Sequence, residues 1–149
     1  MVVRMIYWFY GQPGAGKTTI AKLLKEHFEY KTIGNPVIHI DGDFMREVFS
    51  NTDYSEEGRK NNMRKVTTIA RFLHHKNFHV VISVVGPYKD VRDELLDLNP
   101  KMFYLFTQEV RGREHYHTDA MEIGTDDIWL CTDDKLPIQT LNEVLTIHR

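Results

Sequence analysis

The chain has 149 residues, of which 42% are hydrophobic and 27% are charged, and this composition suits one globular domain over residues 1–149. Its formal net charge of −2 provides no basic surface for nucleic acid, and no apolar run approaches the roughly 20 residues that span a membrane. Residues 1–4 lead almost directly into a predicted strand, without the long leader of a secreted protein. We therefore expect a cytosolic protein whose partners are small molecules or protein.

A glycine-rich stretch at residues 11–19, GQPGAGKTT, matches the phosphate-binding template G-x-x-x-x-G-K-[ST] at every fixed position. An apolar run at 5–10 precedes it as a predicted strand, and apolar residues at helical spacing follow it, which argues against an isolated glycine turn. Glycines let several backbone N–H groups converge on phosphate oxygens at the positive end of the following helix. The stretch predicts a nucleoside triphosphate site formed by Gly11, Gly14, Ala15, Gly16, Lys17, Thr18 and Thr19.

Further apolar runs alternate with segments of helical period, which is typical of an α/β fold. The run at 79–85 is almost continuously β-branched, so we expect it at the centre of a sheet covered on both faces. The sequence thus predicts a three-layer α/β/α P-loop NTPase fold with a mostly parallel five-stranded sheet. Besides the run at 5–10, strands are predicted at 37–40, 79–85, 102–106 and 128–131, and shorter helices at 89–98 (stopped by Asn99-Pro100) and 137–148 (started by Pro137).

The longest helix is predicted from about residue 55 to about residue 76, with Ser55 as its N-cap and acidic residues in its first turn. One turn beyond an apolar stripe, the same face carries Asn62 and Arg59, so polar groups appear where the stripe leaves the core. That position suits a ligand pocket, although Arg59 could equally pair with an acid at the surface. The stripe consists of Met63, Val66, Ile69, Ala70 and Leu73.

Residues 107–125 fit neither a strand nor a helix, and they carry Arg111 and Arg113. We interpret this segment as a lid that excludes water and brings arginines to phosphate oxygens. The alternative is a solvated loop whose charges have no role.

Two polar segments follow predicted strands: Asp41-Gly42-Asp43 after the run at 37–40, and Gly86-Pro87-Tyr88 after the run at 79–85. Ligands of open α/β sheets bind beyond the carboxyl ends of the strands. Both segments should therefore meet the glycine loop at a single site.

Phosphoryl transfer needs cationic charge on the phosphates and a carboxylate near the attacking hydroxyl. Lys17, Asp41 and Asp43 are the predicted catalytic residues, with Lys17 reaching the β- and γ-phosphates. Thr18 and one acid, assigned as Asp41, would hold Mg²⁺, while the other acid would face the hydroxyl. Asp43 could also cap a helix at 44–50, a role that is compatible with catalysis.

Four linked motifs in this order resemble those of adenylylsulfate kinases: GQPGAGKTT, DGDFMR at 41–46, YSEEGRKNNMRKV at 54–66 and GPYKDVRD at 86–93. The resemblance covers about residues 5–98. It implies a P-loop kinase, usually dimeric, that uses ATP and Mg²⁺ to phosphorylate the 3′-hydroxyl of adenylyl sulfate. It also implies that Asp43 is the acid near that hydroxyl and that Tyr54 replaces a phenylalanine stacked on the adenine. The substrate-binding residues implied are Asp43, Arg46, Tyr54, Arg59, Asn62, Gly86 and Pro87.

The chain departs from the family pattern at two places. Gly86 stands where the family usually has serine before Pro87, so a phosphoserine route is closed and direct transfer is expected. The run VRGREHYH at 110–117 replaces the usual lid run of the type K-G-L-Y-K-K-A. Substrate identity therefore stays open between adenylyl sulfate and another acceptor.

Two rival functions remain at this stage. One is a P-loop kinase for a different small-molecule hydroxyl, such as a sugar, a nucleoside or a polysaccharide precursor, which the fold alone does not distinguish. The arginine at position 59 favours an anionic acceptor over a neutral sugar. The other is a regulatory module that binds ATP without turnover, against which Lys17, Asp41 and Asp43 argue.

Overall fold

The computed structural model describes residues 4–31, 36–108, 116–118 and 120–147. Its five strands form one sheet in the order β2-β3-β1-β4-β5, and each pair of neighbours is parallel. The predicted fold class is confirmed, and the described sheet is wholly rather than mostly parallel. The strands are β1 (Ile6–Tyr10), β2 (Val37–Asp41), β3 (His79–Ser83), β4 (Lys101–Phe106) and β5 (Ile128–Cys131).

The central strand is β1, so the prediction that the run at 79–85 lies at the centre is wrong. β3 lies between β2 and β1 and ends at Ser83. Its five residues are all buried, as are those of β1. Because any interior strand of a sheet covered on both faces is apolar throughout, composition identifies β3 as interior but does not fix its place in the order.

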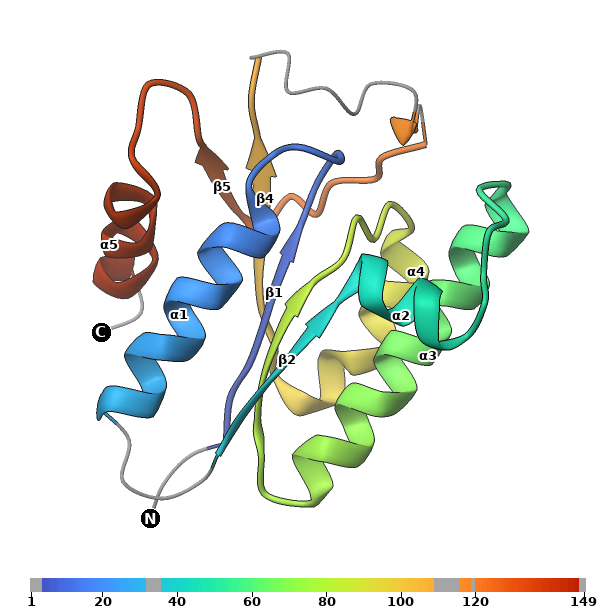
Figure 1. Cartoon of the computed structure of the whole chain (residues 1–149), viewed down its shortest axis with the longest axis horizontal. Coiled ribbons are helices and arrows are strands. Elements are labelled where there is room, and N and C mark those ends of the chain that lie inside the picture. Colours follow the sequence, from blue (N-terminus) through green and yellow to red (C-terminus); the bar gives the residue numbers. More distant parts are fainter. Residues whose placement is uncertain (1–3, 32–35, 109–115, 119, 148–149) are drawn as a thin grey trace.

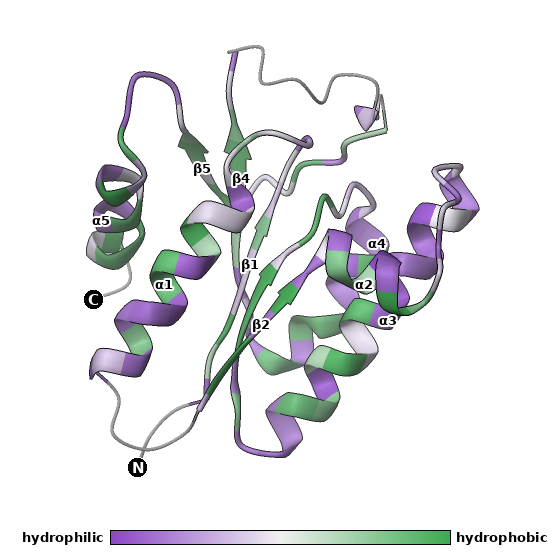
Figure 2. Cartoon of the chain, in the orientation of Figure 1, coloured by the Kyte–Doolittle hydropathy of each residue, from purple (hydrophilic) through white to green (hydrophobic). Residues whose placement is uncertain are grey.

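The helices form a layer on each face of the sheet (Figure 1). One layer holds α1 (Lys17–Lys31) and α5 (Pro137–Ile147), and the other holds α2 (Gly42–Val48), α3 (Glu56–His75), α4 (Lys89–Arg92) and the 3₁₀ helix η1 (Asp93–Leu98). Figure 2 shows that hydrophobic residues concentrate in the strands and on the helix faces toward the sheet. No helix in the described part of the chain is long and apolar enough to cross a membrane.

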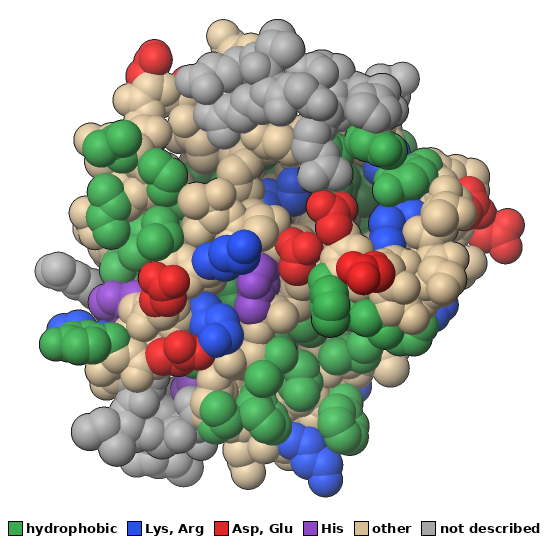
Figure 3. Space-filling model, viewed as in Figure 1, with side chains coloured by type: hydrophobic (Ala, Val, Ile, Leu, Met, Phe, Trp, Pro, Cys, Tyr) green, Lys and Arg blue, Asp and Glu red, His purple; other side chains and the backbone are tan. Residues whose placement is uncertain are grey.

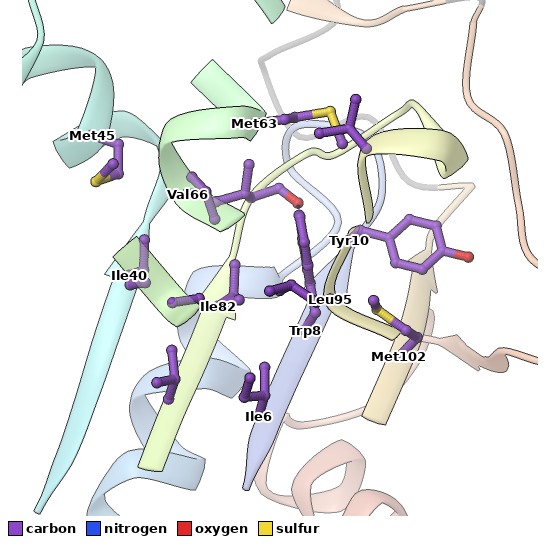
Figure 4. Packing of buried hydrophobic residues seen from close by; sticks show 14 of the residues in the cluster. Ile6, Trp8, Tyr10, Ile40, Met45, Met63, Val66, Ile82, Leu95 and Met102 are labelled. Atoms are coloured by element: carbon purple, nitrogen blue, oxygen red, sulfur yellow. Dashed lines mark hydrogen bonds between the residues drawn. The ribbon is translucent and has the colours of Figure 1, made fainter. Parts of the chain in front are cut away.

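The core is divided by β1, because successive side chains of a strand point to opposite faces. Ile6, Trp8 and Tyr10 pack in the cluster under α3 and α4, whereas Tyr7 and Phe9 pack in the cluster under α1 and α5. Figure 4 shows the first cluster, in which Trp8 is fully buried. Full burial of a large apolar side chain contributes roughly 1.5 to 3 kcal/mol, so both layers are anchored on this strand.

Local signals set the ends of the helices. The Ser55 hydroxyl accepts a hydrogen bond from the Gly58 amide at 3.2 Å, which confirms the predicted N-cap of α3. The predicted helix at 89–98 is instead α4 followed by η1, and it ends at Asn99 in a left-handed conformation (φ 53°) before Pro100. The first turns of α1, α2 and α3 lie at the carboxyl edge of the sheet (Figure 1).

Candidate active site

A pocket of about 390 Å³ lies at the carboxyl edge of the sheet. It brings together the glycine loop, the ends of β2 and β3, and the first turns of α2 and α3, as the sequence predicts. Figure 3 shows acidic and basic side chains side by side on this face, where Figure 1 places the carboxyl ends of the central strands. The predicted site residues that line the pocket are Gly14, Gly16, Lys17, Thr18, Thr19, Asp41, Asp43, Arg46, Tyr54, Arg59, Asn62, Gly86 and Pro87.

Gly11 and Ala15, two residues predicted to contact the nucleotide, support the loop and do not line the pocket. A Cβ atom on Gly11 would come within 2.2 Å of the Leu105 carbonyl oxygen, so only glycine fits between β1 and β4. Ala15 is buried, and its carbonyl accepts a hydrogen bond from the Thr132 hydroxyl at 3.0 Å. Both residues therefore fix the path of the loop backbone beside the pocket.

Lys17 begins α1 and is 7% exposed. Its Nζ donates a hydrogen bond to the Gln12 carbonyl oxygen at 2.8 Å, which keeps the ammonium group over the loop. The positive end of the α1 dipole adds to this charge. The loop thus combines a cation with a helix N-terminus, an arrangement suited to a chain of phosphates.

Asp41 is the last residue of β2 and connects three segments. Its Oδ1 accepts hydrogen bonds from the hydroxyls of Thr18 at 2.8 Å and Ser83 at 3.0 Å, and its Oδ2 accepts one from the Phe44 amide at 3.3 Å. Burial raises the pKa of Asp41, but the hydrogen bonds from Thr18, Ser83 and the Phe44 amide outweigh burial and leave the pKa below its ordinary value. Asp41 is therefore ionised at neutral pH.

The N-cap of α2 is Asp41 and not Asp43, which corrects the capping role considered for Asp43. Asp41 has an extended backbone (φ −103°, ψ 136°), and the helix starts at Gly42. Asp43 consequently lies inside the first turn, and it lines the pocket. The Asp41 carboxylate, by contrast, is bonded to Thr18 at the end of the glycine loop.

Two arginines form the opposite wall. The Arg46 guanidinium lies 3.9 Å from the centroid of the Tyr54 ring and donates hydrogen bonds to the carbonyls of Asn51 and Asp53. Arg59 donates from Nε to the Tyr54 carbonyl and from Nη2 to the Tyr116 carbonyl, both at 2.9 Å. These hydrogen-bond acceptors are neutral, so the hydrogen bonds themselves leave both guanidinium groups charged, while Asp43 and Asp53 are the nearby acids that attract Arg46.

Asn62 follows Arg59 by one helical turn and is 5% exposed. Its Oδ1 has no hydrogen-bond partner among the described residues. A buried acceptor without a partner costs roughly 1 to 3 kcal/mol. Since Asn62 lines the pocket, a ligand N–H or O–H group is a natural partner. The structure thus favours the pocket interpretation of Arg59 and Asn62 over a surface ion pair.

The predicted lid at 107–125 is only partly described, and both Arg111 and Arg113 lie outside the described residues. The segment 116–118 does contact the pocket, which Tyr116 lines. The Tyr116 ring lies 5.0 Å from the Tyr54 ring, centroid to centroid. Tyr116 therefore lies against the part of the pocket formed by Tyr54 and Arg59.

Gly86 takes a left-handed backbone (φ 54°), and a Cβ atom there would lie 3.1 Å from Cζ2 of Trp8. This conformation and this contact explain why glycine suits the position. Arg92, which is 1% exposed, donates hydrogen bonds to the carbonyls of Gly86 and Glu122 and lies 3.9 Å from the Tyr10 ring centroid. Arg92 therefore connects the loop that follows β3 to the backbone at Glu122.

Sequence reasoning missed four residues around the pocket: Gln12, His39, Ser83 and Tyr116. Ser83 and His39 stand out in hindsight as polar residues in apolar strands, which was the available signal. Gln12 and Tyr116 gave no such signal, because their partners lie 106 and 57 residues away in the chain.

Comparison with known proteins agrees with this geometry. The family model for adenylylsulphate kinase matches residues 3–115. The adenylyl-sulfate kinase of Chloroflexus aurantiacus is 34% identical over 105 residues, which are 70% of this chain and 55% of that protein. The cytidine diphosphoramidate kinase of Campylobacter jejuni is 31% identical over 88 residues, 59% of this chain and 51% of that protein. The chain thus spans about half the length of these relatives.

The fold likeness extends beyond the matched part of the sequence. The structure of the Mycobacterium tuberculosis APS kinase CysC in complex with AMPPNP and APS superposes with a TM-score of 0.78 over 100% of both chains, at 17% identity. At this identity the likeness shows a shared fold. Because the family model matches residues 3–115, well over half of the sequence, the chain belongs to the adenylylsulphate kinase family.

Proposed function

We propose that the protein is a kinase that transfers the γ-phosphoryl group of ATP to the 3′-hydroxyl of adenylyl sulfate. One observation carries the proposal: in a member of this family, a single pocket has the phosphate loop with Lys17 on one wall and Arg46, Arg59 and Asn62 on the other. An arginine pair suits an acceptor with phosphate and sulfate oxygens, which a neutral sugar lacks. The loop wall would hold ATP, and the arginine wall would hold the acceptor.

Asp41 and Asp43 would have different roles. Asp41 already accepts hydrogen bonds from Thr18, Ser83 and the Phe44 amide, so it belongs to the phosphate side. Asp43 would then lie near the acceptor hydroxyl and accept its proton as the hydroxyl attacks the γ-phosphorus in line. Lys17 would stabilise the charge that develops on the phosphate oxygens. With Gly86 in place of serine, transfer is direct.

The residues present fit a Mg²⁺ ion beside the loop. The Thr18 hydroxyl and the Asp41 carboxylate are hard oxygen ligands of the kind Mg²⁺ prefers, and they lie 2.8 Å apart at the start of α1. Such an ion, when bound with ATP, supplies positive charge to the β- and γ-phosphates. The part played by this chain is to orient the two oxygen groups toward that position.

A second acceptor is favoured by one relative. The Campylobacter jejuni protein is named for phosphorylating cytidine diphosphoramidate, and its matched region is nearly as similar as that of the adenylyl-sulfate kinases. The compound in that name is also an anionic nucleotide, which the arginine wall would accommodate equally well. The tyrosine pair Tyr54 and Tyr116 can stack on either base.

An acceptor panel tests the proposal. Purified protein is incubated with ATP, Mg²⁺ and adenylyl sulfate, cytidine diphosphoramidate or gluconate, and the phosphorylated products are separated by chromatography. We expect turnover with adenylyl sulfate and none in a Lys17→Ala control. Turnover with only another acceptor would replace the substrate assignment. ATP binding without turnover on any acceptor would support the regulatory alternative.

We also infer that residues 1–149 act as one kinase domain, that the protein is cytosolic, and that it forms a homodimer. An exposed apolar face on α2, which includes Phe44 and Val48, is consistent with self-association. Light scattering at working concentration measures the mass, and a monomer would contradict the dimer.

A further inference from the structure

A chain of polar side chains runs behind the phosphate loop from β2 to β3 and back. In the parallel ladder Asp41 is paired with Ser83, and His39 lies two residues before Asp41 on the same face of β2. His39 Nε2 is 2.7 Å from Ser83 Oγ, and Ser83 Oγ is 3.0 Å from Asp41 Oδ1. Thr18 completes the chain at 2.8 Å from the same Oδ1. The function proposed above gives His39 no role and uses Ser83 only as a hydrogen-bond donor to Asp41.

The positions of the protons in this chain follow from the donors available. The ionised Asp41 carboxylate accepts hydrogen bonds only, so the single hydroxyl protons of Thr18 and Ser83 both point to Asp41. Ser83 Oγ must then accept from His39, which assigns the ring proton to Nε2.

This arrangement fixes the direction in which Thr18 presents its oxygen. With its proton committed to Asp41, Thr18 Oγ1 turns its lone pairs away from Asp41 and toward the pocket, where the proposed Mg²⁺ would be. Asp41 can accept this hydrogen bond from Thr18 only while the Asp41 carboxylate keeps its orientation. The hydrogen bond from Ser83 restrains Oδ1, and His39 restrains Ser83.

We propose that His39 and Ser83 are positioning residues that hold Asp41 and Thr18 in the orientation required for Mg²⁺-dependent nucleotide binding. The inference rests on the phosphate side of the proposed function and is independent of which acceptor is used. It predicts that the pair affects the gain in ATP affinity that Mg²⁺ provides and not the affinity of the loop for ATP alone. A purely structural role would change stability and leave that gain unchanged.

The test compares the dissociation constant of ATP in Mg²⁺ with that in EDTA, measured by titration calorimetry in the absence of acceptor. Ser83→Ala removes both hydrogen bonds of Ser83 Oγ, and His39→Leu removes the one that His39 makes to Ser83, so we expect the Mg²⁺-dependent gain to fall about three- to tenfold in each variant. ATP affinity in EDTA should stay within about twofold. The double variant should lose no more than the larger single loss, because both residues act through one chain.

Two further variants separate positioning from packing. His39→Gln keeps an N–H donor at a similar reach and should restore the gain to within about twofold of wild type. His27→Gln, a matched change at a half-buried histidine of α1 outside the pocket, should have no effect. Because Ser83→Ala removes a single oxygen atom, it remains informative even where the larger change at His39 lowers the melting temperature.

An unchanged gain in folded Ser83→Ala would overturn the inference, as would an equal loss of ATP affinity in Mg²⁺ and in EDTA. A wild-type protein that binds ATP equally in both conditions would overturn it together with the metal assignment. If the gain falls as expected but adenylyl sulfate is not phosphorylated, only the acceptor in the proposed function is wrong.

Discussion

The two walls of the pocket are built in different ways. On the phosphate side, Lys17 and Thr18 belong to one continuous loop and helix start, and β2 adds Asp41. On the acceptor side, Arg46 and Arg59 come from different helices and are held by main-chain carbonyls of the turn between α2 and α3 and of Tyr116. The phosphate wall is thus set largely by local backbone geometry, whereas the acceptor wall depends on contacts between distant segments. Substitutions in one wall should therefore have effects that differ from those of substitutions in the other wall.

The largest expected effect is that of Lys17→Ala on the phosphate side. Removal of the loop ammonium leaves the developing charge on the β- and γ-oxygens unbalanced, so turnover should fall by about ten-thousandfold or more. The melting temperature should change little, because Lys17 lies at the pocket and makes its described side-chain hydrogen bond to a loop carbonyl. Steady-state kinetics and thermal unfolding measure both. Lys31→Ala, at the exposed end of the same helix, is the matched control, and a wild-type rate in Lys17→Ala would contradict the assignment of the loop.

Asp43→Asn should have the next largest effect, and it tests which of the two acids acts on the acceptor. The amide keeps the shape of the side chain but does not accept the acceptor's proton, so kcat should fall roughly a hundred- to thousandfold with little change in ATP affinity. Asp41→Asn should instead weaken Mg²⁺-dependent ATP binding. Measurement of kcat and of ATP affinity with and without Mg²⁺ distinguishes the two variants. If Asp41→Asn alone lowers kcat while ATP affinity is retained, the two acids have been assigned in reverse.

Arg59→Lys should affect the acceptor wall alone. Lysine keeps the charge but lacks the planar fork that bonds the Tyr54 and Tyr116 carbonyls while facing the pocket. With charge-assisted bonds contributing roughly 1.5 to 3 kcal/mol, kcat/KM for adenylyl sulfate should fall about ten- to hundredfold. The assay varies adenylyl sulfate at saturating ATP.

Arg71→Lys supplies the matched control for this variant, since Arg71 lies on the same helix and bonds Asp97 outside the pocket. Its acceptor kinetics should equal those of wild type. Equal acceptor kinetics in wild type and Arg59→Lys would show that the arginine wall does not bind the acceptor.

The same contrast explains what the sequence could predict. The cap at Ser55, the stop at Asn99-Pro100 and the glycine loop are local features of the sequence. The cap and the stop are found as predicted, and the loop lines the pocket except at Gly11 and Ala15. The choice between Asp41 and Asp43 as N-cap depended on the residue at which β2 ends, and hydrophobicity alone leaves that boundary uncertain by a residue or two.

Features that depend on pairing between distant segments of the chain are harder to predict from the sequence. The central place of β1 is decided by which strands pair with it, and residues 7–9 pair with both β3 and β4. The link from His39 to Ser83 depends on the register of β2 and β3, 44 residues apart. A single sequence contains the residues of such contacts but not the geometry that joins them.

The smallest expected effect tests whether the two walls communicate. The side chain of Gln12, in the phosphate loop, donates a hydrogen bond to the Thr118 carbonyl at 2.6 Å and accepts one from the Thr118 amide at 3.0 Å. Thr118 follows Tyr116 by two residues, and the Tyr116 carbonyl holds Arg59. One carboxamide therefore connects the loop to the residues that cover the acceptor wall.

Gln12→Leu removes both hydrogen bonds and leaves the Gln12 carbonyl that holds Lys17 in place. Because two neutral hydrogen bonds contribute about 1 to 3 kcal/mol before any compensation by water, we expect the KM for adenylyl sulfate to rise about three- to tenfold. ATP affinity without acceptor should stay within about twofold, while the mutual enhancement of ATP and acceptor binding should decrease. Calorimetric titration of each ligand with and without the other measures that enhancement, with Gln139→Leu at the start of α5 as the control. If Gln12→Leu weakens ATP binding alone and leaves the enhancement intact, Gln12 serves only the loop and the two walls act independently.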